Sequence, residues 1–159
     1  MKTNRMTLAV VAALAAATLA GCGTVSGWIH RPPPETAQPL PQPGFVQSVS
    51  LSGANEVPPV ETKASGTGNV IVNPDRSVIA SISVTGMTET AAHIHMGAAG
   101  TNGPVIVPLA KSGENAFSSA PGAKLTEEQY AAFKAGNTYV NVHSEAHKGG
   151  EVRAQLKGG

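Results

Sequence analysis

The sequence predicts an all-β fold, an antiparallel sandwich or barrel of short strands with one short helix in a connecting loop. The 159 residues include 18 Gly and 12 Pro but only one Trp, two Tyr and three Phe, which leaves little aromatic surface for a helical bundle. From residue 45 onward, apolar and polar residues alternate in short segments bounded by Gly, Pro, Asn or Ser, a pattern typical of strands. The predicted strands cover residues 46–51, 68–72, 78–84, 92–96, 105–109, 138–143 and 151–156.

Turn and cap residues support two of the connections. Asn-Pro-Asp-Arg at 73–76 predicts a hairpin turn, because Pro presets one backbone dihedral and the Asn and Asp side chains can hydrogen-bond the turn. Thr126 is a suitable N-cap and Gln129 completes a capping box, so the helix is predicted to begin there. Gly136 stands where a left-handed cap would end it.

The first 21 residues are predicted to be a signal peptide. Lys2 and Arg5 precede an apolar run that is too short and too Ala-rich for a membrane span. Leu-Ala-Gly-Cys at 19–22 resembles the bacterial lipobox, in which cleavage precedes the Cys and lipid is attached to it. We therefore expect lipidation of Cys22, the alternative being an ordinary signal peptide with a Cys near its cleavage site.

The segment that follows the cleavage site is predicted to be a tether. Residues 22–44 hold six of the prolines, and such a sequence spaces a domain from its anchor without packing. A domain over 45–159 would then be attached to the membrane through its lipid anchor. We expect a location in the cell envelope, at the outer membrane if the organism has one, because Gly23 rather than Asp follows the Cys.

Charge and cysteine content exclude several function classes. The formal net charge is +1, and loss of Lys2 and Arg5 leaves nine Lys and Arg against ten Asp and Glu, so nucleic-acid binding is not expected. Nothing indicates a particular protein partner. A single Cys forms no intramolecular disulfide, and the sequence has no nucleophile elbow and one Asp, placed in a turn. A binding protein is therefore expected before an enzyme.

Three histidines suggest a metal site. In the strand over 92–96, His93 and His95 project to one face, because successive side chains of a strand alternate. His143 lies on the polar face of the strand over 138–143, and neutral imidazole binds copper, zinc, iron or nickel. Candidates for a further ligand are His147, Glu145, Glu56 and water. The competing interpretation is that these histidines only hydrogen-bond loop backbone.

Four motifs resemble the CHRD domain, a family named from chordin. They occur in the family's order at residues 51–59 (LSGANEVPP), 92–105 (AHIHMGAAGTNGPV), 139–144 (YVNVHS) and 149–156 (GGEVRAQL). The resemblance implies an extracytoplasmic β-sandwich that, in bacteria, belongs to secreted proteins and lipoproteins of mostly unassigned function. It implies no catalytic activity.

A His-x-His strand, a Gly-rich loop and a distant third His are also similar to copper/zinc superoxide dismutase, a Greek-key β fold. That enzyme needs more histidines and an Asp for its second metal, so this chain is expected to bind one ion at most. The combined expectation is an antiparallel Greek-key-like β-sandwich holding one metal, copper before zinc, through His93, His95 and His143. The alternatives are an interaction module without metal and a mononuclear copper enzyme resembling the dismutase.

Overall fold

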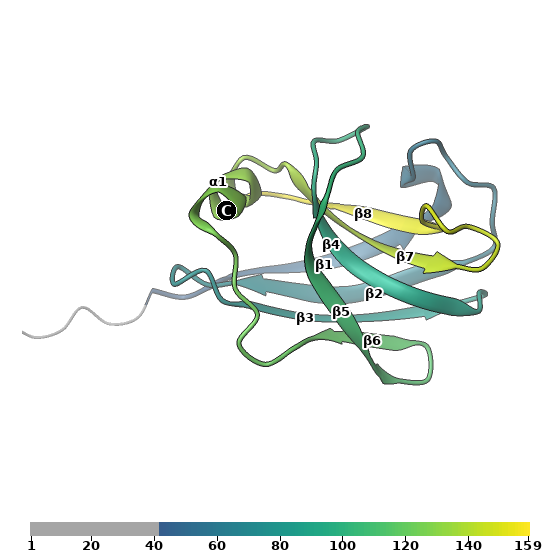
Figure 1. The fold of residues 1–159 in the computed structure, drawn as a ribbon, viewed down its shortest axis with the longest axis horizontal. Helices are drawn as coiled ribbons and strands as arrows, with labels where there is room; N and C mark the ends of the chain where they lie inside the picture. Colours follow the sequence, from purple (N-terminus) through teal and green to yellow (C-terminus); the bar gives the residue numbers. More distant parts are fainter. Residues whose placement is uncertain (1–41) are drawn as a thin grey trace, which may run out of the picture. The chain divides into compact units, whose positions relative to one another are not determined.

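A computed structural model describes residues 42–159, so the predicted signal peptide, Cys22 and most of the tether lie outside the described residues. The described part contains eight strands, one α-helix and one 3₁₀ turn (Figure 1). In chain order these elements are β1 (Phe45–Ser52), the 3₁₀ turn η1 (Gly53–Asn55), β2 (Ser65–Val72), β3 (Val78–Thr85), β4 (Glu89–Met96), β5 (Val105–Gly113), β6 (Ala116–Ser119), α1 (Glu127–Lys134), β7 (Thr138–Ser144) and β8 (Val152–Leu156).

The strands form a closed antiparallel barrel in the order β1-β2-β3-β6-β5-β4-β7-β8. Strands β4, β5 and β6 follow one another, and β7 then returns to lie beside β4, which is the Greek-key arrangement. The predicted all-β, Greek-key-like fold is confirmed. Its strands form one closed barrel, so the two sheets of the expected sandwich are joined at their edges. Strand β6 was not predicted, because its four residues, Ala-Phe-Ser-Ser, show too little alternation.

Alternation determines which side chains form the core. Strand β3 alternates buried and exposed residues along its whole length, and the apolar residues of the other strands face the same interior. Burial of these side chains contributes most of the folding energy, at about 25 cal/mol per Å² of apolar surface. The fully or nearly fully buried core residues include Leu51, Val70, Ile82, Val84, Phe117, Val140, Val142, Val152 and Leu156.

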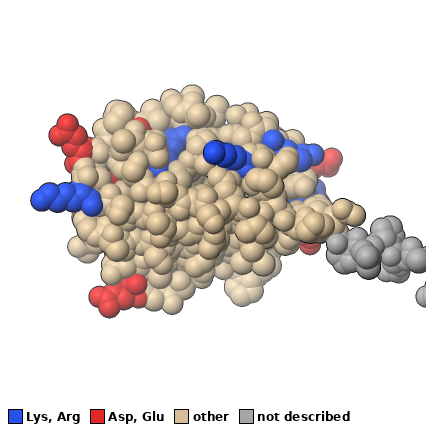
Figure 2. Space-filling view, turned by 180° about the vertical axis from the view of Figure 1, so that it is seen from behind, with Lys and Arg blue, Asp and Glu red and all other residues tan. Residues whose placement is uncertain are grey.

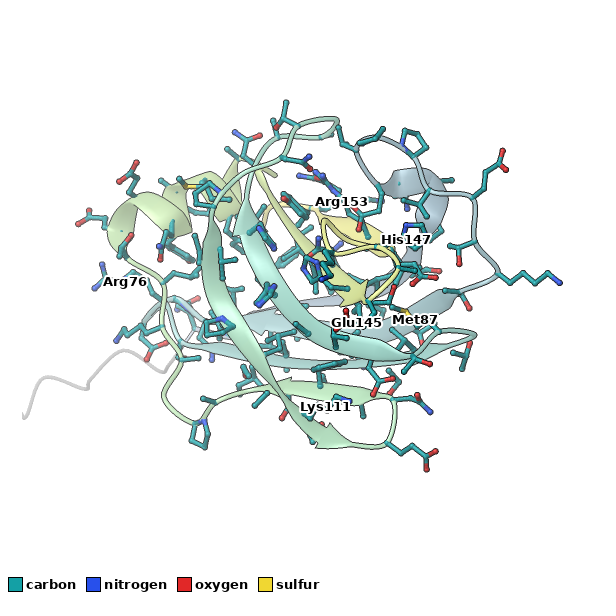
Figure 3. The ribbon with its side chains drawn as sticks, turned by 45° about the vertical axis from the view of Figure 1, so that its right-hand side comes forward. Arg76, Met87, Lys111, Glu145, His147 and Arg153 are labelled. Atoms are coloured by element: carbon teal, nitrogen blue, oxygen red, sulfur yellow. The ribbon has the colours of Figure 1, made fainter. Side chains whose placement is uncertain are left out.

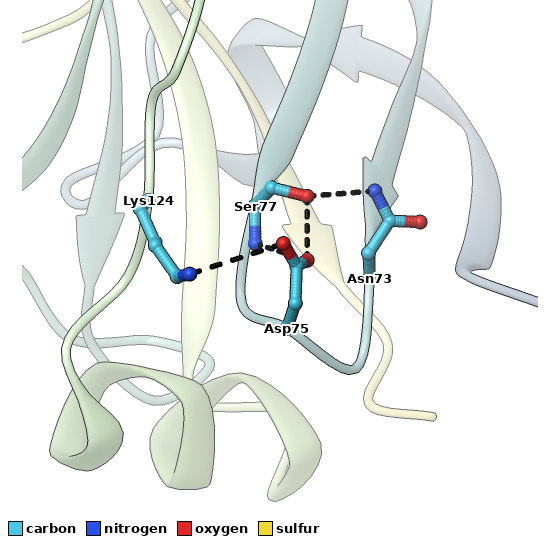
Figure 4. Close-up of polar contacts among 4 residues, drawn as sticks. All are labelled: Asn73, Asp75, Ser77 and Lys124. Carbon is cyan, nitrogen blue, oxygen red and sulfur yellow. Dashed lines mark hydrogen bonds and ion pairs between the residues drawn. The ribbon is translucent and has the colours of Figure 1, made fainter. Parts of the chain in front are cut away.

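The predicted turn between β2 and β3 is confirmed. Oδ1 of Asp75 accepts hydrogen bonds from the N–H of Ser77 (3.0 Å) and from its hydroxyl (2.7 Å), while Nδ2 of Asn73 donates to the same hydroxyl oxygen (2.9 Å) (Figure 4). Lys124 lies 3.8 Å from Asp75. The side-chain bonds hold Arg76 in a left-handed conformation, with φ of 73°.

The predicted capping box of α1 is present, with bonds between Thr126 and Gln129 in both directions. Gly136 follows the helix with φ of 74°. Buried Phe133 packs edge-on against Phe45, so α1 covers one end of the barrel. Among the described residues, no helix has the length and apolar character needed to cross a bilayer.

The barrel closes unevenly. Strands β4 and β7 pair from Glu89 to Met96, whereas β1 and β8 share one ladder pair, Ser52 with Arg153. Beyond that pair the Gln47 side chain spans the gap, because its Oε1 accepts a hydrogen bond from the N–H of Lys157 (2.8 Å). We refer to this junction of β1 and β8 as the terminal seam.

The outer face of β4, β7 and β8 is polar yet largely covered. Loops over 53–64, 97–104 and 145–151 connect or flank these strands, and Asn141 and Arg153 are each only 1% exposed. Figure 2, which views the molecule from behind Figure 1, shows Lys and Arg side chains across the upper part of that face and Asp and Glu side chains near its edges. The polar residues under the loops therefore form a buried site and not an ordinary solvated surface.

Candidate metal centre

The structure brings His93, His95 and His143 together. The register of β4 and β7 pairs Ala91 with His143 and His93 with Asn141, so His143 is the diagonal neighbour of His93 on the outer face. One ring nitrogen from each histidine lies within 4.8 Å of the others, and Nδ1 of His93 is 3.1 Å from Nε2 of His143. Three strand-borne imidazoles thus converge at one point.

Backbone carbonyls orient two of the three rings. Nδ1 of His95 donates to the carbonyl oxygen of Gly103 (2.9 Å), and Nδ1 of His143 donates to that of Lys148 (3.0 Å). A carbonyl oxygen only accepts, so the proton lies on Nδ1 of each ring and Nε2 keeps its lone pair. Such bonds are the usual outer support of a metal-binding histidine.

Burial favours the neutral form of the three imidazoles. It is the largest cause lowering the pKa of His93, His95 and His143 below 6.5, and the neighbouring histidines lower the pKa of His93 and His143 further. Metal binding requires the neutral ring. Two nitrogens at about 2.0–2.1 Å from one tetrahedral ion stand about 3.3 Å apart, close to the observed 3.1 Å, so the donor set fits a small transition metal.

Tyr139 and Arg153 form a column behind His95. The rings of His95 and Tyr139 are stacked, with centroids 4.8 Å apart and planes 6° from parallel. The Arg153 guanidinium carbon lies 3.4 Å from the Tyr139 centroid, and the Tyr139 hydroxyl accepts a hydrogen bond from the N–H of Gly103 (3.2 Å). Tyr139 therefore holds His95 in two ways. Its ring stacks on the His95 ring, and its hydroxyl positions Gly103, whose carbonyl oxygen accepts the hydrogen bond from Nδ1 of His95.

Arg153 also orders the Gly-rich loop over 97–104. Its guanidinium donates to the carbonyl oxygens of Thr101 (2.9 Å) and Ala98 (3.4 Å) and to Oδ1 of Asn102 (3.2 Å). Gly103 permits the tight approach of this loop to β4, because a Cβ there would collide with the carbonyl oxygen of Met96. The loop is thus a structural element that holds His95.

The weaker ligand candidates lie elsewhere. Glu145 and His147 are in the loop between β7 and β8 (Figure 3), where Glu145 is exposed and pairs with Lys148 at 3.6 Å. Glu56 is only 4% exposed but is outside the cluster of converging donors. Within residues 42–159, that cluster consists of the three histidines alone.

Sequence reasoning did not identify Tyr139 or Asn141 as parts of the site. Strand alternation places Tyr139 and Asn141 on the same face as His143, and this was the available signal. Their burial depends on loops whose course no periodic pattern describes. Cys22, predicted to carry lipid, lies outside the described residues.

The comparisons with known proteins agree with the motif resemblance. The family model of the CHRD domain matches residues 47–156, which include every strand pair of the site and all three histidines. No curated protein and no solved structure matches the chain. The expected family is confirmed: the chain belongs to the CHRD domain family.

Proposed function

We propose that this protein binds one metal ion, copper in preference to zinc, through His93, His95 and His143. The observation that carries the proposal is the convergence of three neutral imidazoles, two of them oriented by backbone carbonyls. A surface histidine needs no such support. Three buried or half-buried imidazoles facing one another would be poorly solvated without an ion.

The donor set favours copper and zinc over harder cations. Imidazole nitrogen suits both metals, and a nitrogen site binds copper(II) more strongly than zinc in the usual affinity order. When bound, copper would supply one-electron chemistry and zinc a Lewis acid. The protein's own part is to keep the rings neutral and to hold His95 between Tyr139 and the Gly103 carbonyl.

Metal titration of the purified chain tests the proposal. Copper(II) and zinc are titrated by calorimetry, bound metal is measured by elemental analysis, and the melting temperature is recorded. One equivalent should bind and stabilise the protein by about 2.7 kcal/mol at a free metal concentration 100 times Kd. Alanine substitution of any one of the three histidines should remove most of this gain, whereas the control His147→Ala should retain it.

Two alternative functions predict different results in these experiments. If the three alanine variants bind and melt like the parent in metal, the proposed site is wrong and a metal-free interaction module becomes the better account. The partial exposure of His93 and His143 favours a catalytic alternative, because an exogenous ligand could reach the ion. Faster removal of superoxide by the copper-loaded chain than by copper-loaded His95→Ala would support that alternative.

We also propose that the domain is anchored in the cell envelope through lipid on Cys22. The lipobox-like residues 19–22 and the Pro-rich segment to residue 44 support this. Cys22→Ser should leave the precursor uncleaved and reduce the salt-resistant fraction in membranes. Membrane recovery of Cys22→Ser at the parent level after a salt wash would refute lipid anchoring.

A further inference from the structure

Three unpartnered polar atoms cluster on the inner side of the histidine site. Oε1 of Glu56, Nε2 of His95 and Oδ1 of Asn141 are buried and have no hydrogen-bond partner within the described chain. The three side chains are 4%, 8% and 1% exposed. Buried polar atoms are nearly always paired. The Asn141 amide lies beside the Glu56 carboxyl, which leaves Nε2 of His95 and Oδ1 of Asn141 without a donor.

Asn141 connects the other two residues. A Cβ at Gly150 would collide with Oε1 of Glu56 and come within 2.6 Å of Nδ2 of Asn141, so both atoms line the same side of the Gly150 backbone. The register of β4 and β7 pairs Asn141 with His93 and so makes it the diagonal neighbour of His95, whose ring the Asn141 side chain approaches. Asn141 therefore lies between the buried carboxyl and the histidine cluster.

The neighbouring groups determine which way the oxygen and the nitrogen of the Asn141 amide point. The Glu56 carboxyl and the carbonyl oxygen of Gly149, which is 3.5 Å from Nδ2, are both acceptors. The NH₂ group must face these acceptors, so Oδ1 faces His95. Nε2 of His95 is also an acceptor, since its Nδ1 carries the proton. Two buried acceptors thus face each other with no proton between them, an arrangement that a cation together with a hydrogen-bond donor would relieve.

We propose that Asn141 is a positioning residue that selects protic oxygen ligands, such as water, for the metal. The inference rests on the proposed metal site. His95 binds the ion through Nε2, and Oδ1 of Asn141 accepts a hydrogen bond from the O–H of the exogenous ligand. Glu56 keeps the amide in the required orientation. Aprotic anions cannot donate this bond and are bound less well.

Azide is the probe, because it binds copper(II) through nitrogen and donates no hydrogen bond. The chain is loaded with copper(II) and titrated with azide, and the charge-transfer absorption gives its Kd. Asn141→Leu removes the acceptor that favours water, so azide should bind about three- to tenfold more tightly. Asn141→Asp keeps an acceptor and adds negative charge, so azide should bind at least about tenfold more weakly. The control Asn69→Leu, on exposed β2 surface, should match the parent.

A second measurement needs no variant. The electron paramagnetic resonance lines of the copper(II)-loaded parent should broaden in water enriched in ¹⁷O, because a coordinated water carries the isotope. Absence of broadening, or equal azide affinity in the parent, Asn141→Leu and Asn141→Asp, would overturn the inference. The copper titration distinguishes failure of the proposed metal site from failure of this inference. If the metal site is wrong, the parent binds no copper or His95→Ala binds copper as well as the parent does.

Discussion

Replacement of Arg153 by Met should destabilise the fold and weaken the metal site together. Arg153 is only 1% exposed, and its guanidinium donates to two loop carbonyls and two side-chain oxygens while covering the Tyr139 ring. Methionine retains the apolar stem but leaves the acceptors without a donor. Hydrogen bonds to charged groups contribute about 1.5–3 kcal/mol each, and partial access of water to the loop recovers some of this.

The expected loss is about 4 kcal/mol of unfolding free energy. With an unfolding entropy of about 2.1 cal/mol/K per residue over the described domain, the melting temperature should fall by about 15 °C. Because Arg153 orders the loop that contains the Gly103 carbonyl, metal affinity should fall about 10- to 100-fold. Thermal unfolding without metal and copper titration by calorimetry measure the two effects separately.

The control is Arg76→Met, which removes a guanidinium from the hairpin turn between β2 and β3 and should leave both quantities near the parent values. A melting temperature of Arg153→Met within about 3 °C of the parent would refute the energetic argument. A large fall in stability with unchanged metal affinity in the folded fraction would refute the link from Arg153 to His95.

Three further predictions concern pH, loop packing and capping. Burial holds the pKa of His93, His95 and His143 below the unfolded value of 6.5, so their contribution to stability is full above about pH 6.5 and is lost as pH falls through the folded pKa values. The melting temperature of the metal-free chain should therefore drop on acidification from pH 7, and a flat profile would contradict this. Gly103→Ala should cost about 3 kcal/mol in urea unfolding, while the control Gly149→Ala, whose Cβ meets open space, should stay within about 0.5 kcal/mol. Thr126→Ala should cost about 1 kcal/mol and Thr126→Ser much less; equal losses would contradict the capping role.

The sequence predicted the structure well where a short repeating pattern of apolar and polar residues, or a local turn or cap motif, determines it. Alternation located seven strands, and the side-chain chemistry of residues 73–76 and 126–129 located a turn and a helix start. The shared face of His93 and His95 follows from the same period. That His143 lies diagonal to His93 depends on strand register, which the spacing alone could not determine.

The remainder of the site depends on long-range packing. Glu56 lies beside Asn141 because the segment after β1 folds back onto β8, where Asn55 donates to the carbonyl oxygen of Arg153. Arg153 is buried because the loop after β4 closes on it. Each contact joins residues far apart in the chain, and a charged residue in a strand is ordinarily expected to be solvated. Sequence reasoning could therefore not predict that Arg153 supports a histidine of the cluster.

The terminal seam has a consequence for how the native state opens. One ladder pair and a side-chain amide hold β1 to β8, so separation of the chain's two end strands breaks few hydrogen bonds, whereas β4 and β7 pair over most of their length. Opening of this kind should occur well before global unfolding and expose amides of β1 to exchange with solvent deuterium. The strands that carry the histidines belong to the slowly exchanging part of the barrel. A bound ion could thus stay in place through many openings of the seam, and its release would require a rarer, larger fluctuation.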